Sequence, residues 1–262
     1  MDNSEQIDYW NGKAGETWAR IPLKMDAMLE PLSAVAIASA NVQPGESVLD
    51  IGCGCGSTSI QMASSGAHVL GVDISAPMLA YARQRTADMN NIAFEQSDAS
   101  SKTFEPTHQL IFSRFGVMFF ADPIQAFTNL SSALAPDGRL NILCWQSPKD
   151  NPWLSISAAA LAPFLPPPEA PNPKAPGPFC FADKDYFKDV LQSAGFGNID
   201  ITPVNQDLFL GATLDEALSL QSEVGPLSAA LAQLTGDQKD AAIAAVSAAL
   251  TPHVKPDGLR LP

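Results

Sequence analysis

The chain has 262 residues, 46% of them hydrophobic, and its 28 acidic and 15 basic residues give a formal net charge of −13. This length and composition predict one large domain, or a domain with a cap, around an ordinary core. The acidic balance argues against a nucleic-acid partner, because non-specific binding needs a basic surface that neutralises phosphates. No apolar run is as long as a transmembrane helix, so no membrane span is expected.

Two further features indicate the compartment. The N-terminus, MDNSEQIDYW, is acidic and polar, unlike a signal peptide. Cys53 and Cys55 lie too close together to indicate a disulfide framework. With Cys144 and Cys180 far away in the sequence, the four cysteines also lack the spacing that is typical of a metal site. We therefore expect a cytoplasmic protein, a monomer or homodimer, without a metal.

Residues 1–46 are expected to form a helical cap segment ahead of the first strand. This segment carries the aromatic residues Tyr9, Trp10 and Trp18. Two interpretations stay open. The rings either pack the segment onto the domain or offer a π face to a cationic ligand.

The stretch SVLDIGCGCGSTSIQMA, residues 47–63, predicts a strand, a glycine loop and a helix. The apolar run around Val48 and Ile51 is typical of a short buried strand. Gly52, Gly54 and Gly56 follow at every second position, and helical residues continue to a stop near residue 66. Strand, glycine loop and helix together are typical of a nucleotide site.

The acids around this loop indicate which nucleotide is bound. A second apolar strand, HVLGVDIS, ends in Asp73, about 20 residues beyond the first glycine, where an acid binds ribose hydroxyls. Asp50 stands beside the loop and would oppose a pyrophosphate, and the glycine spacing is G-x-G-x-G rather than G-x-G-x-x-G. A ligand with a cationic amino-acid end would instead gain from Asp50. S-adenosylmethionine has an ammonium, a sulfonium and no phosphate.

The following segments predict that strands and helices continue to alternate. The strand LIF leads into FSRFGVMFF, residues 112–120, at the end of the sheet where ligands bind. A helix is expected from Asp122, its N-cap, with Pro123 in the first turn, followed by the strand GRLNILCW. The pattern predicts an α/β fold with a doubly wound, mostly parallel sheet. Residues 47–146 would form the donor-binding core.

The second half divides into three expected segments. Residues 147–182 form a Pro-rich region, in which eight of the 22 prolines fall between Pro163 and Pro178. This stretch is either a disordered linker or an ordered loop over the active site, and apolar anchors such as Phe179 favour the loop. Residues 183–210 would supply a final core helix and strand. Residues 211–262 read as a helical insertion and a C-terminal segment that stops where a further strand would begin.

The motifs VLDIGCGCGSTS and VLGVDISAPMLAYAR resemble the class I S-adenosylmethionine-dependent methyltransferases, closest to the ubiquinone- and menaquinone-biosynthesis branch. The resemblance runs from about Tyr9 to Asn205 and implies a Rossmann-like core that binds this methyl donor. FEQSDAS resembles the strand end whose acid, Asp98, contacts the adenine amino group. One departure is that His108 and Gln109 stand where the family usually has an Asp.

Position and resemblance together give the expected site. The residues expected to bind the donor are Asp50, Gly52, Gly54, Gly56, Asp73, Ile74, Met78, Asp98, Ala99, Ser113, Trp10 and Trp18. The residues expected to bind the acceptor are Phe115, Met118, Phe119, Trp145, Trp153 and Phe179.

No motif supplies a dedicated base. His68 and His108 open predicted strands, at the end away from the ligand, and are expected to be structural. The polar candidates for a catalytic role are Arg114, which could hold an anionic acceptor or make a salt bridge, and His253. Methyl transfer needs mainly alignment and exclusion of water, so an acceptor that is already nucleophilic needs no base.

The sequence predicts a methyltransferase for a small apolar or aromatic acceptor, with methyl transfer to O, N, S or C. A second hypothesis is an NAD(P)-dependent oxidoreductase, which the glycine spacing and the lack of a Tyr-Lys pair disfavour. A third is a non-catalytic S-adenosylmethionine-binding protein, to which the missing Asp near residue 108 lends some weight.

Overall fold

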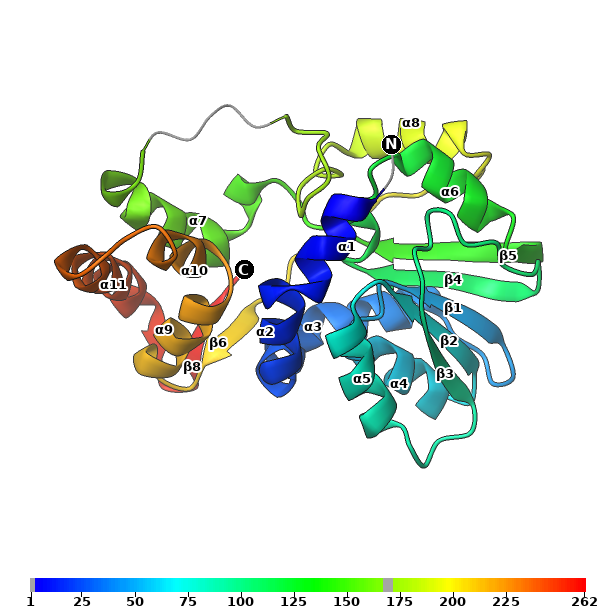
Figure 1. The fold of residues 1–262 in the computed structure, drawn as a ribbon, viewed down its shortest axis with the longest axis horizontal. Coiled ribbons are helices and arrows are strands. Elements are labelled where there is room, and N and C mark those ends of the chain that lie inside the picture. Colours follow the sequence, from blue (N-terminus) through cyan, green and yellow to red (C-terminus); the bar gives the residue numbers. More distant parts are fainter. Residues whose placement is uncertain (1–2, 167–171) are drawn as a thin grey trace. The chain divides into compact units, whose positions relative to one another are not determined.

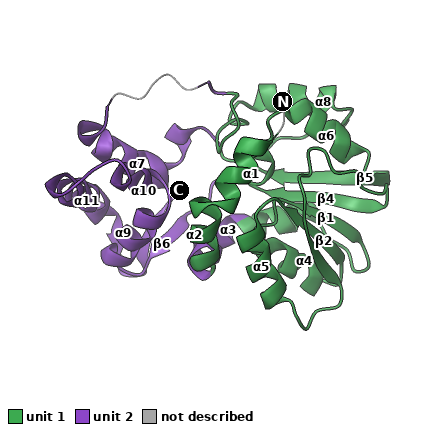
Figure 2. Cartoon of the chain, viewed as in Figure 1, with its two compact units in different colours: residues 1–22, 33–145, 174–203 green, residues 23–32, 146–173, 204–262 purple. Residues whose placement is uncertain are grey.

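A computed structural model describes residues 3–166 and 172–262, which form two compact units (Figure 2). Unit 1 comprises Met1–Pro22, Ser33–Trp145 and Lys174–Pro203. Unit 2 comprises Leu23–Leu32, Gln146–Pro173 and Val204–Pro262. These boundaries differ from the consecutive segments expected from the sequence, because each unit combines stretches that are far apart in the chain.

Unit 1 is built on a five-stranded sheet in the order β3-β2-β1-β4-β5, with all neighbouring strands parallel (Figure 1). The strands are β1 (Ser47–Ile51), β2 (His68–Asp73), β3 (Ile92–Gln96), β4 (His108–Arg114) and β5 (Leu134–Leu143). The central strands β1 and β4 are mostly buried, as expected where both faces of a parallel sheet are covered. The strand order reverses between β1 and β4, which is where open α/β sheets bind ligands.

Helices cover both faces of this sheet (Figure 1). Alternate strand residues point to opposite faces, so Val48 and Phe112 pack in one cluster with Met62 of α4, while Leu49 and Ile111 pack in another. The second cluster includes Phe127 of α6 and residues of α8. The helices just named are α4 (Ser57–Ser64), α6 (Pro123–Ser131) and α8 (Lys184–Ser193), and the helix that follows β2 is α5 (Ala76–Arg85). The predicted doubly wound α/β fold is confirmed.

The segment before the sheet is helical, as predicted, and forms α1 (Ser4–Asn11), α2 (Lys13–Arg20) and α3 (Pro22–Ala40). The predicted N-cap of α6 is also present, since the Asp122 carboxylate accepts the backbone N–H of Gln125 at 3.0 Å.

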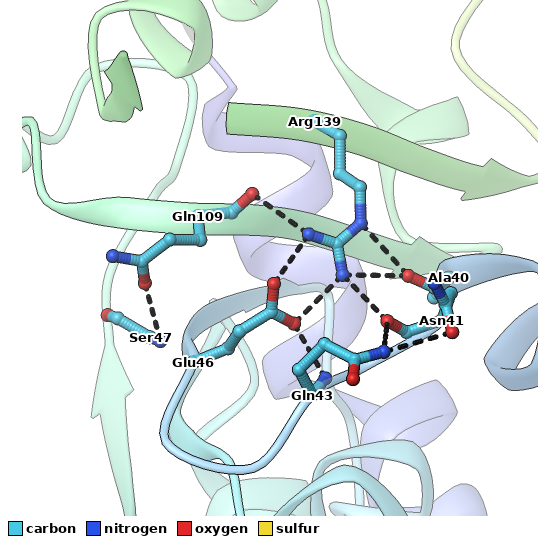
Figure 3. Close-up of polar contacts among 7 residues, drawn as sticks. All are labelled: Ala40, Asn41, Gln43, Glu46, Ser47, Gln109 and Arg139. Carbon is cyan, nitrogen blue, oxygen red and sulfur yellow. Dashed lines mark hydrogen bonds and ion pairs between the residues drawn. The ribbon is translucent and has the colours of Figure 1, made fainter. Parts of the chain in front are cut away.

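Arg139 of β5 fixes the end of α3 to the start of β1 (Figure 3). Its Nη1 and Nη2 donate to the two carboxylate oxygens of Glu46 at 2.7 and 2.8 Å. Its Nε and Nη2 also donate to the carbonyl of Ala40, the last residue of α3, at 3.0 and 2.8 Å. One planar guanidinium thus satisfies a helix C-terminus and a carboxylate together.

The structure differs from the prediction after α8. The expected core strand of 183–210 forms only β6 (Leu208–Gly211), which pairs antiparallel with β8 (Gly258–Leu261) in a second sheet of order β6-β8-β7. The partner of β8 on its other side is β7 (Val254–Lys255). Leu208 and Leu210 of β6 and Leu259 and Leu261 of β8 are all buried, and both strands belong to unit 2. The C-terminal residues therefore do form a strand, but not in the sheet of unit 1.

Unit 2 also contains four α-helices: α7 (Pro152–Leu161), α9 (Leu214–Glu223), α10 (Pro226–Leu231) and α11 (Asp237–Leu250). Helices α9, α10 and α11 lie in residues 211–262, which were expected to be a helical insertion, whereas α7 falls in the region expected to be a Pro-rich loop. Its start has Pro152 in the first turn, and Trp153, Ser157 and Leu161 are buried at helical spacing. Residues 167–171 of that region lie outside the described part of the chain.

Short 3₁₀ turns complete the description: η1 (Val117–Phe119), η2 (Pro148–Asp150), η3 (Ala162–Phe164) and η4 (Thr251–His253). Across residues 3–166 and 172–262, no helix has the length and apolar character needed to cross a bilayer.

Candidate functional site

The loop between β1 and α4 explains its three glycines. Gly52, Gly54 and Gly56 have φ values of 67°, 55° and 80°, in the left-handed region that other residues adopt only with strain. A Cβ on Gly52 would collide with the backbone of Gly116, and a Cβ on Gly54 would lie 2.7 Å from the Met78 Cε. The loop therefore brings bare backbone to the carboxyl edge of the sheet.

Asp50 lies at the end of β1, fully buried behind this loop. Its Oδ2 accepts the hydroxyls of Thr58 at 2.9 Å and Ser59 at 2.5 Å, both from the first turn of α4. Its Oδ1 has no hydrogen-bond partner within the described chain. Burial raises the pKa of Asp50 to about 6. A buried acceptor of this kind is costly unless a ligand or a water satisfies it.

Asp73 ends β2 and faces the same loop. Its Oδ2 accepts the backbone N–H of Gly54 at 2.8 Å, and its Oδ1 accepts that of Ser75 at 2.8 Å. Burial raises its pKa, against the lowering effect of these backbone bonds. Each carboxylate oxygen has two lone pairs, so Asp73 keeps acceptor capacity for further donors. Ile74 and Met78 follow it, and Met78 is buried.

Asp98 and Ala99 follow the end of β3. The Asp98 Oδ1 accepts the backbone N–H of Ser100 at 2.9 Å and the side-chain amide of Asn3 at 3.4 Å. Asn3 also accepts the backbone N–H of Ala121 at 3.3 Å. The acids at the ends of β1 and β2 and just after β3 therefore stand at the carboxyl ends of neighbouring strands, as the sequence predicts.

The turn after β4 is constrained by Ser113 and Phe115. The Ser113 hydroxyl donates to the carbonyl of Ile51 at 2.8 Å and accepts the N–H of Gly116 at 3.2 Å, so it ties the turn to β1. Phe115 has a φ of 65°, which is uncommon for a bulky residue. Such strained backbone conformations cluster at functional sites. Its ring stacks on Trp145, with centroids 4.1 Å apart.

Three more residues that were expected to bind the methyl acceptor lie in unit 1: Met118, Phe119 and Phe179. Met118 is buried, and its carbonyl accepts the N–H of Gly177 at 2.9 Å and the thiol of Cys180 at 2.9 Å. These contacts fasten the segment that contains Phe179 to the turn after β4. Phe119 packs against Trp10, with centroids 5.3 Å apart.

The N-terminal helices are attached beside Asp73. Trp10 contacts Trp18, with centroids 6.0 Å apart, and its carbonyl accepts the Ser75 hydroxyl at 2.7 Å. The side chain of Asn11 donates to the Ile74 carbonyl at 2.9 Å and accepts the Ala76 N–H at 3.0 Å. Sequence reasoning missed Asn11. The signal available was an Asn followed by Gly12 between two helical stretches, but that pattern does not identify its partner.

The two catalytic candidates lie in different units. Arg114 ends β4 in unit 1, and its Nη1 donates to the Ser33 hydroxyl at 2.6 Å. His253 and the acceptor candidate Trp153 belong to unit 2 and remain predictions. His68 and His108 open β2 and β4, as predicted, and the His108 Nδ1 lies 2.9 Å from the Ser47 hydroxyl.

Part of the core matches a known protein family. Residues 48–138 match the family described as "Methyltransferase domain". Over 110 residues the chain is 34% identical to phosphoethanolamine N-methyltransferase 1 of Zea mays, a match that covers 40% of this chain and 22% of the relative. Over 105 residues it is 32% identical to demethylmenaquinone methyltransferase of Clavibacter sepedonicus, covering 40% and 43%.

The fold also matches a solved structure. The YcgJ protein of Bacillus subtilis aligns with a TM-score of 0.57 at 17% identity, over 88% of this chain and 93% of that one. The chain spans less than half of the length of these two curated relatives. Residues 48–138 thus match a methyltransferase-domain family, and the matches to both relatives do not single out the branch that the sequence motifs resemble.

Proposed function

We propose that the chain is an S-adenosylmethionine-dependent methyltransferase for a small, largely apolar or aromatic acceptor. One observation carries the proposal. Asp50 near the end of β1, Asp73 at the end of β2 and Asp98 just after β3 stand at the carboxyl ends of three neighbouring strands, around a loop whose three glycines are all left-handed. The methyltransferase-domain match over residues 48–138 supports the same conclusion.

The chain's groups fit this donor. The unsatisfied Asp50 Oδ1 suits an ammonium, directly or through one ordered water. Asp73 retains lone pairs for the ribose hydroxyls, and the backbone at Gly52 and Gly54 leaves room for close approach. When bound, the donor supplies an electrophilic methyl group on a sulfonium.

The resemblance extends the assignment to the adenine. Asp98 would accept from its exocyclic amine, the Ala99 N–H would donate to a ring nitrogen, and Ile74 and Met78 would cover the ring faces. Ser113 would fix the turn beside the methionine portion through its bond to the Ile51 carbonyl. The π faces of Trp10 and Trp18 suit a sulfonium.

The acceptor is expected against the aromatic residues after β4 and β5. Phe115 and Trp145 provide a stacked pair, and Met118, Phe119 and Phe179 add apolar area. Such a surface binds through burial, at about 25 cal/mol per Å² of apolar area, and excludes water from the transfer. The histidines of unit 1, His68 and His108, open β2 and β4 at the end of the sheet away from this edge. We therefore propose an acceptor that is already nucleophilic or ionises unaided: a phenol-like ring, an amine or a thiol.

Calorimetric titration with S-adenosylmethionine, S-adenosylhomocysteine and NADH tests the donor assignment. We expect binding of the first two and not of NADH. Tight NADH binding without the others would favour the oxidoreductase hypothesis.

An assay of S-adenosylhomocysteine formation with quinone precursors, phenols, thiols and amines tests the acceptor. Turnover with at least one member is expected. Donor binding without any turnover across the panel would favour the non-catalytic hypothesis, and turnover only with a protein or nucleic acid would contradict the proposed acceptor class.

A further inference from the structure

We infer that Asn129 of α6 and Asn3, ahead of α1, are positioning residues that set the selectivity of the donor site for an aminopurine base. Neither residue is expected to touch the donor. Both hold the turn at residues 98–102, which follows β3, and so fix where a base can meet its partners. This inference rests on the proposed function, in which Asp98 and Ala99 meet the adenine, and adds the side chains that control their orientation.

The turn is closed by its own backbone and by the Asp98 carboxylate. The N–H groups of Ser101 and Lys102 donate to the Asp98 carbonyl at 3.2 and 2.9 Å. The N–H of Ser100 donates to the Asp98 Oδ1 at 2.9 Å. Like the end of any helix, this single helix-like turn leaves its last carbonyls, those of Ala99 and Lys102, without partners inside the turn. Its orientation therefore depends on groups outside it.

Asn129 supplies the missing bonds from α6. Its Nδ2 donates to the Ala99 carbonyl at 2.9 Å and to the Lys102 carbonyl at 2.7 Å, so both hydrogens of one amide are used on the turn. Ala99 is buried and packs in the cluster that contains Phe127 and Leu130 of α6. The turn is thereby bonded to a helix that packing holds against the sheet.

Asn3 holds the carboxylate of the same turn. It is buried at the N-cap of α1, but its side chain does not cap that helix. Its Nδ2 instead donates to the Asp98 Oδ1 at 3.4 Å, and its Oδ1 accepts the N–H of Ala121 at 3.3 Å. Across residues 3–166 and 172–262, the hydrogen bonds to this carboxylate all end on Oδ1. The Asp98 Oδ2 thus keeps its lone pairs for an exocyclic amine, next to the N–H of Ala99.

A fixed turn discriminates between bases because it cannot adjust to the wrong pattern of donors and acceptors. Adenine offers an amine to the Asp98 Oδ2 and an unprotonated ring nitrogen to the Ala99 N–H. Hypoxanthine, its deaminated form, offers an oxygen to the carboxylate and a ring N–H to the backbone N–H, so both contacts become repulsive. A polar site rejects such an analogue because its own groups are left unpaired. A loose turn would move away from the mismatch and lose this discrimination.

The test compares S-adenosylhomocysteine with S-inosylhomocysteine, which differs only in the deaminated base. Calorimetric titrations would use the full-length wild type, Asn129→Ala and Asn3→Ala. Asn129→Ala should weaken S-adenosylhomocysteine about tenfold and leave S-inosylhomocysteine within about twofold, so that the ratio of the two affinities falls about tenfold. Asn3→Ala should lower the same ratio by less, because its bond to Asp98 is longer.

Asn91→Ala is the matched control. Asn91 precedes β3, at the other end of the strand, and its Nδ2 also donates to two carbonyls, those of Ala63 and Ala67, both at 2.8 Å. This variant loses equivalent bonds and should be destabilised to a similar extent in urea unfolding, while the affinity ratio stays at the wild-type value. If Asn129→Ala does not fold, Asn129→Ser keeps one donor and should still lower the ratio.

The two-ligand comparison separates base selectivity from a structural role and from the proposed function. If Asn129→Ala weakens both ligands equally, as a merely structural residue would, the inference is overturned. A wild type that binds both ligands equally well would also overturn it, since there would be no selectivity to control. A wild type that binds neither ligand would overturn the proposed function itself.

Discussion

At the scale of single residues, Asp73 holds the glycine loop and is expected to hold the ribose as well. Replacing it with Ala removes the acceptor for the ribose hydroxyls and frees the N–H groups of Gly54 and Ser75. We expect Asp73→Ala to weaken S-adenosylhomocysteine binding by about 1–3 kcal/mol, the cost of leaving buried polar groups unpaired. Titration calorimetry measures this loss.

The matched control is Asp88→Ala, which removes an exposed carboxylate between α5 and β3. It should bind the ligand like the wild type. Equal affinities for Asp73→Ala and Asp88→Ala would show that the ribose does not bind at β2.

Asp50 should make donor binding depend on pH. Burial raises its pKa to about 6, and the charge of Asp73 adds to this effect, while Ser59, Thr58 and Arg114 act against it. A bound ammonium favours the ionised carboxylate, so the pKa in the complex lies below that of the free protein. Binding then releases a proton at pH values below about 6. Affinity for S-adenosylmethionine should therefore fall as the pH drops below this value and level off above it.

Calorimetry in buffers of different ionisation enthalpy would detect the released proton. Methylthioadenosine lacks the amino-acid end, so its binding reports any titration of Asp73 without that of Asp50. Asp50→Asn should remove the difference between the two ligands. A pH profile for S-adenosylmethionine that is unchanged in Asp50→Asn would contradict the assignment of the ammonium to this residue.

At the scale of elements, Arg139 connects α3, β1 and β5 (Figure 3). Lysine keeps the charge at this position but lacks the planar fork that reaches Glu46 and the Ala40 carbonyl together. Arg139→Lys should destabilise the protein by about 1–2 kcal/mol, measured by urea unfolding. Arg83→Lys is the control, because Arg83 is exposed and its guanidinium donates to the Phe94 carbonyl at 3.0 Å rather than to a carboxylate. Equal unfolding midpoints for the two variants would show that the bidentate contact is not stabilising.

The sequence predicts elements well where the signal is local. The run from Val48 to Gly56 combines a strand period with glycines that only a left-handed loop requires, and both are observed. Helix α7 was missed because the surrounding prolines outweighed its own signals, Pro152 in the first turn and buried residues at helical spacing. The sequence also did not predict which side chains pair with which partners. The Asn11 side chain forms hydrogen bonds with the backbone of residues 74 and 76, which are distant in the chain.

At the scale of the whole molecule, strand pairing is the feature that the sequence could not supply. Residues 198–210 were expected to extend the core sheet, but Leu208 begins a strand that pairs with β8, about 50 residues later in the chain. Pro203 has no N–H for a central ladder, which weighs against a strand through the whole segment. Alternation of apolar residues predicts which face of a strand is buried, but not which strand lies beside it.

The net charge of −13 leads to a prediction about the rate of donor capture. S-adenosylmethionine carries one net positive charge at neutral pH, whereas S-adenosylhomocysteine is neutral overall. A negatively charged protein attracts S-adenosylmethionine over several ångströms and has little long-range effect on S-adenosylhomocysteine, and salt screens this attraction.

Stopped-flow measurement of tryptophan fluorescence, with Trp10 and Trp18 as reporters, should show the S-adenosylmethionine association rate falling severalfold between about 0.02 and about 0.3 M NaCl. The S-adenosylhomocysteine rate should stay nearly constant over the same range. Equal salt dependence for the two ligands would show that the overall charge plays no part in donor capture, and a rate that rises with salt for S-adenosylmethionine would show that a local positive field at the site outweighs it.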